Sequence, residues 1–442
     1  MASQRKDQVS ALQTKKVIYA DLLIPGRGEP QKNAALTYSH GKISYVGSQG
    51  NLPEEFRNAD ITRVPVLLPG LWDCHVHFFG AKKQSFKEFT SVSQILAGAR
   101  SAHDASRTLD AGFTSVREMA GYGLELSKAI EEGLIVGPRI YSSHAALSIT
   151  GGHVDPAHIP IETLEREICH GLFFALADGV DGCTKAVRLQ VRRGAHLIKV
   201  CASGGITSRF DNPEHAQFSD AELKAVVEEA RRSDRIVAAH CHGLAGIMAA
   251  LRAGCHTIEH GTYLDDGALG LMKDQGAILV PTRTVFEAVS ASPESMEPES
   301  YTKLSRLVDA HQAAYKKAVA SGVKIALGSD IGLSSRGTGF THGDNGKELV
   351  CAVEAGLTPL QAIEAATAMG PQTLGPTYAP LSGQLKEGYD ADLIVLSGNP
   401  LEDINVFADP RNITHVWKGG TLFKAPGMPV LSGYDTQAIY EG

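Results

Sequence analysis

Residues 71–77 read Leu-Trp-Asp-Cys-His-Val-His, a short apolar run that ends in two histidines separated by one residue. Side chains two positions apart on a β-strand point to the same face, so His75 and His77 can grip one cation together. Two satisfied core histidines are the structural alternative, but it does not explain why both stand at the end of an apolar strand. The stretch therefore predicts a strand that ends in a metal-binding pair.

Outward from this stretch, short apolar runs alternate with longer helical segments. The predicted strands are residues 71–77, 114–119, 139–143, 196–203, 235–242, 257–260, 277–282 and 324–330. The predicted helices include residues 219–233, 244–253, 266–275, 301–321 and 358–369, the first of which opens with a capping box from Ser219 to Glu222. Near-continuous apolar strands that alternate with helices are typical of parallel sheets. Eight such units predict an α/β fold, a (β/α)8 TIM barrel.

Both ends of the chain carry a different pattern, of short alternating or β-branched runs. These runs are residues 16–23, 35–38, 42–46, 62–66, 392–396, 413–418 and 421–423. They are typical of antiparallel strands, and neither group is large enough to form a core alone. We therefore expect both termini to build one small β-sandwich domain, residues 1–66 and 383–442, beside a barrel of residues 67–382.

The composition excludes several classes of protein. The chain has 442 residues, 43% of them hydrophobic and 21% charged, as in soluble globular proteins. The net charge of −7 and the lack of a basic run argue against nucleic acid as a partner. No apolar stretch is long enough to span a membrane, and the polar first 16 residues resemble no secretory signal, so we expect a cytoplasmic protein, with a secreted mature form as the alternative. The seven scattered cysteines contain no CxxC pair and predict free thiols.

More ionisable residues stand at the ends of the other predicted strands, where a TIM barrel places its active site. Lys199 lies inside the fourth strand, His240 and His242 end the fifth, His260 ends the sixth and Asp330 ends the eighth. Asp330 alone could be a helix N-cap, and Lys199 alone could be an edge residue reaching solvent. Neither alternative explains the histidines that share these strand ends.

This set of residues predicts two divalent metal ions, with zinc favoured, because imidazole and carboxylate ligands suit zinc. A buried lysine loses its proton readily, and its neutral amine can add carbon dioxide. We expect the resulting carboxylated Lys199 and a hydroxide to bridge the two ions. One ion would be held by His75, His77 and Asp330, and the other by His240 and His260.

The predicted chemistry is attack of that hydroxide on an amide carbonyl. Asp330 would take the proton and pass it to the departing amine, and His242 would donate to the developing oxyanion. Candidates for binding a substrate carboxylate are Arg209, Tyr263, Arg283 and His153, each of which is equally well explained as an ordinary loop residue. Phe173 and Phe174 could form an apolar wall or belong to the core.

Residues 68–77 and 383–396, together with the order of the ligand positions, resemble the amidohydrolase superfamily. Within it the chain is similar to imidazolonepropionase-like and Xaa-Pro dipeptidase-like enzymes, and more closely to the fungal ochratoxinase family. That likeness is carried by residues 121–123, 136–143, 199–205, 246–250 and 416–420.

The resemblance implies a binuclear metal-dependent hydrolase with a carboxypeptidase-like action on a small-molecule amide or dipeptide-like substrate. In that family the cut releases a C-terminal phenylalanine from an aromatic acyl group, as in the conversion of ochratoxin A to ochratoxin alpha. It also implies a homo-oligomer, up to an octamer. The chain departs from the family at residues 169–174, 261–263 and 341–343, loops that we expect at the barrel mouth, where substrate preference is set.

Other functions fit the same residues. An Xaa-Pro or other dipeptidase and an imidazolonepropionase-like cyclic amidohydrolase would use the same site. A single-metal deaminase is disfavoured by Lys199, which those enzymes typically lack. A non-catalytic scaffold is disfavoured because all six predicted ligand positions are intact.

Overall fold

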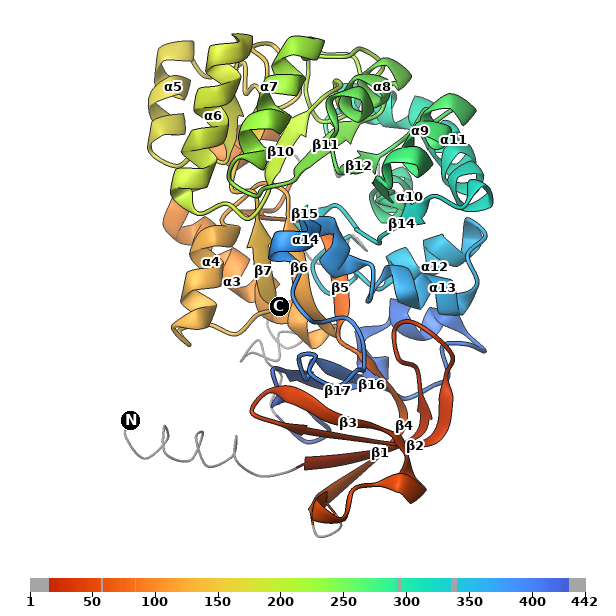
Figure 1. The fold of residues 1–442 in the computed structure, drawn as a ribbon. Helices are drawn as coiled ribbons and strands as arrows, with labels where there is room; N and C mark the ends of the chain where they lie inside the picture. The colour runs from red at the N-terminus through yellow and green to blue at the C-terminus, as the bar shows by residue number, and fades with distance from the viewer. Residues whose placement is uncertain (1–15, 57–58, 84, 292–295, 335–339, 429–442) are drawn as a thin grey trace.

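A parallel β-barrel forms the centre of the computed structural model, which describes residues 16–56, 59–83, 85–291, 296–334 and 340–428 (Figure 1). Eight of its strands overlap the predicted ranges, two short ones, residues 146–148 and 331–333, lie outside them, and the fold class is confirmed. The barrel strands are β5 (Leu71–Ala81), β6 (Phe113–Glu118), β7 (Arg139–Ser142), β8 (Ala146–Ser148), β10 (Ile198–Cys201), β11 (Val237–Cys241), β12 (Thr257–His260), β13 (Ile278–Val280), β14 (Lys324–Ile325) and β15 (Ile331–Leu333).

Two hydrogen-bonded sheets join to close this barrel. One runs β15-β5-β6-β7, and the other runs from β14 to β8 and ends in a short extra strand, β9 (Phe174–Leu176). The backbone N–H of Cys74 donates to the carbonyl of Leu327 at 2.8 Å, which ties the eighth strand to the first. The predicted third strand forms β7 and is followed by a second short strand, β8. Of the predicted eighth strand, residues 324–330, only β14 has strand structure, and β15 follows it.

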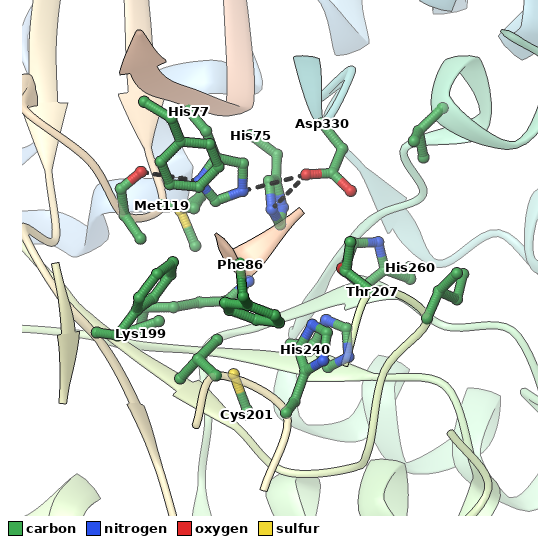
Figure 2. Close-up of a pocket in the computed structure, with 18 of the residues that line it drawn as sticks. His75, His77, Phe86, Met119, Lys199, Cys201, Thr207, His240, His260 and Asp330 are labelled. Carbon is green, nitrogen blue, oxygen red and sulfur yellow. Dashed lines mark hydrogen bonds and ion pairs between the residues drawn. The ribbon is translucent and has the colours of Figure 1, made fainter. Parts of the chain in front are cut away.

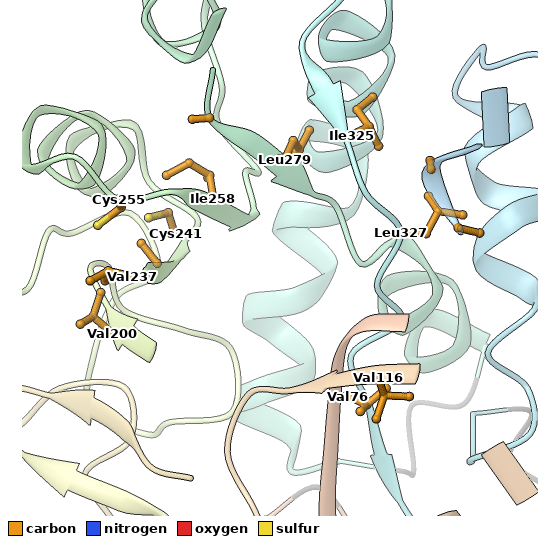
Figure 3. Packing of buried hydrophobic residues seen from close by; sticks show 14 of the residues in the cluster. Val76, Val116, Val200, Val237, Cys241, Cys255, Ile258, Leu279, Ile325 and Leu327 are labelled. Atoms are coloured by element: carbon orange, nitrogen blue, oxygen red, sulfur yellow. The ribbon is translucent and has the colours of Figure 1, made fainter. Parts of the chain in front are cut away.

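Helices surround the barrel because each carries one apolar face (Figure 1). The Ser219 hydroxyl and the Glu222 carboxylate form the predicted capping box at the start of α7 (Asp220–Arg231). Apolar side chains that point outward from the strands, such as Val76, Val200 and Leu279, fill the layer under the helices (Figure 3). The longer helices are α3 (Gln94–Asp110), α4 (Gly123–Glu131), α5 (Ile161–Cys169), α6 (Gly179–Arg193), α7 (Asp220–Arg231), α8 (Leu244–Ala253), α9 (Asp266–Gln275), α10 (Arg283–Ala291), α11 (Pro298–Ser321), α12 (Lys347–Glu354) and α13 (Pro359–Ala365).

Strands from both ends of the chain form one seven-stranded sheet in the order β18-β17-β16-β4-β1-β2-β3. The sheet curls on itself: Tyr38 on β2 and Trp417 on β17 meet in one core, although four strand positions separate them. Both layers of the expected sandwich therefore come from a single sheet. Its strands are β1 (Lys16–Leu23), β2 (Gln31–Ser39), β3 (Lys42–Ser48), β4 (Asp60–Pro69), β16 (Leu393–Leu396), β17 (Ile413–Lys418) and β18 (Thr421–Lys424).

The predicted division of the chain at residues 66 and 383 stays a prediction, and parts of it, residues 1–15, 57–58 and 429–442, lie outside the described residues. Among the helices of the described chain, none has the length and apolar character that crossing a membrane requires.

Candidate active site

The carboxyl ends of the barrel strands surround one pocket (Figure 2). In this pocket His75, His77 and Asp330 lie together, and His240 and His260 face them. The tertiary structure thus brings the whole predicted set into one space. The members that line the pocket are His75, His77, Lys199, His240, His242, His260 and Asp330.

Strained backbone lies at the mouth of the barrel. His260, Thr282 and Asp330 have φ values of 68°, 56° and 59°, in a left-handed region that residues other than glycine rarely adopt. On β12, Ile258 packs outward in the core and Glu259 points inward. Simple alternation would turn His260 outward again, and its left-handed conformation returns the side chain to the pocket. Such strain is a common feature of functional sites.

His75 and His77 converge on Asp330. Its Oδ1 lies 3.4 Å from Nε2 of His75 and 3.1 Å from Nε2 of His77. The opposite ring nitrogens are held from behind: Nδ1 of His75 bonds to Glu259 at 2.8 Å, and Nδ1 of His77 bonds to the carbonyl of Ala120 at 2.8 Å. Because carboxylate and carbonyl oxygens can only accept from these rings, Nδ1 carries the proton and Nε2 keeps its lone pair for a metal.

His240 and His260 face the same space with different ring nitrogens. Nδ1 of His260 bonds to the hydroxyl of Thr282 at 2.7 Å, which leaves Nε2 for the pocket. Nε2 of His240 instead lies 3.2 Å from the carbonyl of Gly204, so its nitrogen with a lone pair is Nδ1. The two rings are 4.6 Å apart between centroids.

Two groups of possible ligand atoms overlap at His260. One donor atom from each of His240, His242 and His260 lies within 4.8 Å of the others, and the same holds for His75, His260 and Asp330. His260 therefore stands between two positions that could each hold a cation.

Burial sets the protonation of these groups. It lowers the pKa of His75 to about 4 and that of His242 to about 3, and it lowers the pKa of His240 and His260 well below the usual value. The rings are therefore neutral near pH 7, which is the form that binds metal. Burial opposes ionisation of Asp330, but the neighbouring histidines and Lys199 hold its pKa below the ordinary value.

Lys199 is 3% exposed, and burial lowers the pKa of its ammonium group. Among the described residues its Nζ has no hydrogen bond or ion pair. An unpaired buried charge is unfavourable, so burial favours the neutral amine. Neutral imidazoles, one carboxylate and a neutral amine that could be carboxylated are a donor set that fits two divalent cations.

A buried ion pair supports the site from inside the barrel, and its two residues are not among those that the sequence motifs predict. Nη2 of Arg117 donates to the two carboxylate oxygens of Glu259 at 2.7 and 2.8 Å, and Glu259 in turn holds His75. Both side chains are fully buried. A signal was present in the sequence, since charged residues inside apolar strands need partners.

Apolar side chains line the rest of the pocket. Phe174 belongs to this wall, whereas Phe173 lies behind it, 5.1 Å from Phe79 and 5.2 Å from Tyr122 between ring centroids. Phe174 is thus part of the apolar wall, and Phe173 belongs to the core. The larger apolar residues of the wall are Phe79, Phe86, Phe89, Met119, Phe174, Phe286, Met296 and Leu304.

Arg283 was a candidate for the substrate carboxylate, and the structure places it elsewhere. Its guanidinium pairs with Glu287 and donates to the carbonyl of Val308 at 2.8 Å, so its hydrogen-bonding capacity is used inside the helix layer. It does not line the pocket formed by the described residues.

The other substrate candidates are spread over different places. Arg209 is exposed in an outer pocket that adjoins the inner one through Phe86 and Thr207. Tyr263 packs against the cluster around Phe286 and is not part of the described pocket wall. Of the four candidates for binding the substrate carboxylate, only His153 lines the inner pocket. Burial lowers the pKa of its ring to about 4.

The loop around Thr341–Gly343 was expected at the barrel mouth, and this expectation is wrong for His342. That ring is fully buried behind β5, with Nε2 3.0 Å from the carbonyl of His77 and Nδ1 3.1 Å from the hydroxyl of Thr108. It stacks on Phe78 at 4.8 Å. The segment therefore supports the first strand from outside the barrel.

Comparison with known proteins identifies relatives of this chain. Residues 66–423 match the model of the amidohydrolase family. Ochratoxinase from Aspergillus niger is 50% identical over 430 residues, which cover 93% of this chain and 87% of that protein. The crystal structure of A. niger ochratoxinase aligns with a TM-score of 0.89 and 48% identity over 96% of this chain and 98% of the other. A prolidase complexed with N-methylphosphonate-L-proline aligns with a TM-score of 0.84 and 33% identity over 93% of this chain and all of the other, 100%.

Proposed function

This chain belongs to the amidohydrolase family, and from that membership we propose that it hydrolyses the amide bond to a C-terminal amino acid, with ochratoxin A as a substrate and ochratoxin alpha and phenylalanine as products. The observation that carries the proposal is the single pocket in which all six expected metal-binding side chains meet, in a chain half identical to an ochratoxinase. It is a hydrolase of amide bonds; the substrate and the steps below are our proposals.

The proposed cofactor is a pair of divalent cations, with zinc favoured. His75, His77 and Asp330 would hold one, His240 and His260 the other, and carboxylated Lys199 both. When bound, such cations activate water and polarise a carbonyl oxygen as Lewis acids.

Asp330 is the proposed general base and acid. Its carboxylate is ionised and lines the pocket, 3.1 Å from His77 and 3.4 Å from His75. It would accept a proton from the attacking water and deliver it to the nitrogen of the departing amine. One carboxylate can perform both transfers because the proton gained in the first step is the one lost in the second.

His242 is the proposed donor to the carbonyl oxygen as negative charge develops there. Donation from Nε2 requires a proton on that nitrogen and a lone pair on Nδ1. The hydroxyl of Thr262 lies 2.8 Å from Nδ1 and can donate to it, which would favour this tautomer. Thr262 is thus a proposed positioning residue for His242.

The aromatic wall supports a substrate with a large apolar group. Phe79, Phe86, Phe89 and Phe174 line one side of the pocket, and Phe286 lines another. Burial of an aromatic ring against such side chains is strongly favourable. A second function, hydrolysis of Xaa-Pro dipeptides, is favoured by the structural likeness to a prolidase.

A substrate panel tests the proposal. Purified protein with measured metal content would be assayed against ochratoxin A, N-acyl-phenylalanines and Xaa-Pro dipeptides. We expect hydrolysis of the first two with release of phenylalanine. Turnover of Xaa-Pro dipeptides alone would favour the prolidase function, and a metal-loaded protein that hydrolyses none of them would contradict both.

A further inference from the structure

His153 is held in one orientation beside the proposed metal ligands. Its ring stacks on His240, with centroids 4.3 Å apart and planes 19° from parallel. It also lies against Gly205, where an added Cβ would be 2.0 Å from Cε1 of the ring. Nδ1 lies 2.8 Å from the hydroxyl oxygen of Ser208. The ring therefore has little freedom to rotate, and it lines the inner pocket.

The proton of the Ser208 hydroxyl is directed away from this ring. Ser208 donates to Oδ1 of Asp211, a carboxylate that also accepts from Nζ of Lys303 at 2.9 Å and from the backbone N–H of Gly205 at 2.8 Å. A carboxylate held by an ammonium group and two further donors is an acceptor. A hydroxyl has one proton, so Ser208 is the acceptor in its bond with His153.

This assignment determines the tautomer of His153. Nδ1 must carry the hydrogen that Ser208 accepts, and Nε2 of the neutral ring keeps a lone pair. Nε2 has no hydrogen bond among the described residues, and the side chain keeps 12% of its surface exposed. His153 lines the pocket beside His240, and Nε2 is the ring nitrogen that no described residue engages.

Resting on the proposed function, we propose that Nε2 of His153 accepts a hydrogen bond from the N–H of the scissile amide. Secondary amides such as N-acyl-phenylalanines have this hydrogen, whereas Xaa-Pro bonds are tertiary amides and lack it. A site built to pair with a donor discriminates against an analogue that leaves the acceptor unpaired. His153 therefore makes the enzyme selective for secondary amides.

The direct test compares an N-acyl-phenylalanine with its N-methylated counterpart, which differs at the amide nitrogen. The measured ratio is kcat/KM for the N-acyl-phenylalanine divided by kcat/KM for its N-methylated counterpart. It is determined in the wild type and in His153→Phe. Phenylalanine keeps a flat ring against His240 and removes the acceptor. We expect the ratio to fall by about tenfold, the value of one ordinary hydrogen bond. The control is His170→Phe, an exposed histidine on the outer layer, which should leave the ratio unchanged.

A second variant keeps the imidazole. Ser208→Ala removes the acceptor that fixes Nδ1–H, so the ring can exchange tautomers and the ratio should fall while metal content stays the same. Nitrogen-15 spectra of histidine-labelled protein, with His153 assigned from the His153→Phe spectrum, should show an Nδ1–H ring in the wild type and a mixture in Ser208→Ala. If His153→Phe does not fold, Ser208→Ala decides the question.

The two proposals fail in different ways. A wild type that hydrolyses no amide overturns the proposed function. A wild type that hydrolyses N-acyl-phenylalanine, with a ratio that neither variant changes, overturns only the role of His153. A ring protonated on Nε2 in the wild type would overturn it as well.

Discussion

The Nδ1 nitrogen of His75 donates to the carboxylate of Glu259 at 2.8 Å, and both side chains are almost completely buried. Glu259 is held in turn by Arg117. A carboxylate behind a metal-binding histidine orients the ring and increases the basicity of the opposite nitrogen. The relationship links the interior of the barrel to the pocket above it.

From this pair we predict that Glu259→Gln weakens metal binding. The amide carries no charge and accepts less strongly, so the dissociation constant of zinc should rise by about 10–100-fold. Competition with a chromophoric chelator measures it. The control is Glu118→Gln, a buried carboxyl that bonds to Ser142 and whose pKa burial raises to about 8. An equal loss of zinc affinity in Glu118→Gln would mean that replacing any buried carboxyl group weakens metal binding, and would contradict a specific role of Glu259.

The two threonines behind His242 and His260 should have separable effects. Each hydroxyl lies within 2.8 Å of a histidine Nδ1. Thr262→Ala should lower kcat by about tenfold with metal content unchanged, because a proposed oxyanion donor loses its fixed tautomer. Thr282→Ala should instead lower metal affinity, because a proposed ligand loses its support. Metal titrations and steady-state kinetics check this. If Thr262→Ala lowered metal affinity and Thr282→Ala lowered kcat, His242 would be the metal ligand and His260 the oxyanion donor.

Asp330→Asn tests the proton transfers. We expect kcat to fall by about 10²–10⁴, the usual contribution of a general acid–base group. The protein should stay folded and largely metal-bound, since an amide oxygen can still lie beside His75 and His77. Circular dichroism and metal analysis check this. Substantial turnover by the metal-loaded variant would reject the assignment.

Metal removal and carbon dioxide test the role of Lys199. A chelator should abolish hydrolysis and lower the melting temperature, because a ligand of the native state stabilises it. Zinc with bicarbonate should restore activity more completely than zinc in buffer free of carbon dioxide, since the neutral amine must add carbon dioxide and lose a proton to form the carbamate. Lys199→Arg should show no response to bicarbonate. Equal recovery of the wild type in both buffers would argue against the carbamate.

Much of this architecture follows from local patterns. The strand at residues 71–77 and the helix start at Ser219 depend on periodicity and on a cap within a few residues, so the sequence predicts both. Lys199 and His240 stand inward for the same reason, because each lies on a regular strand with a fixed alternation. The order of these residues along eight strands was enough to predict that they meet at one end of a barrel.

Other features depend on contacts between segments far apart in the chain. His260 points into the pocket only because its backbone leaves the regular strand conformation, and alternation alone would have assigned the position to Glu259. Arg283 was a reasonable anchor for a carboxylate until the fold placed Glu287 and the carbonyl of Val308 around it. The amino-acid sequence was enough to predict the barrel and the residue types at its mouth. Which nitrogen of each ring faces the pocket follows from the folded chain alone, because that choice depends on a hydrogen-bond partner supplied by another strand or loop.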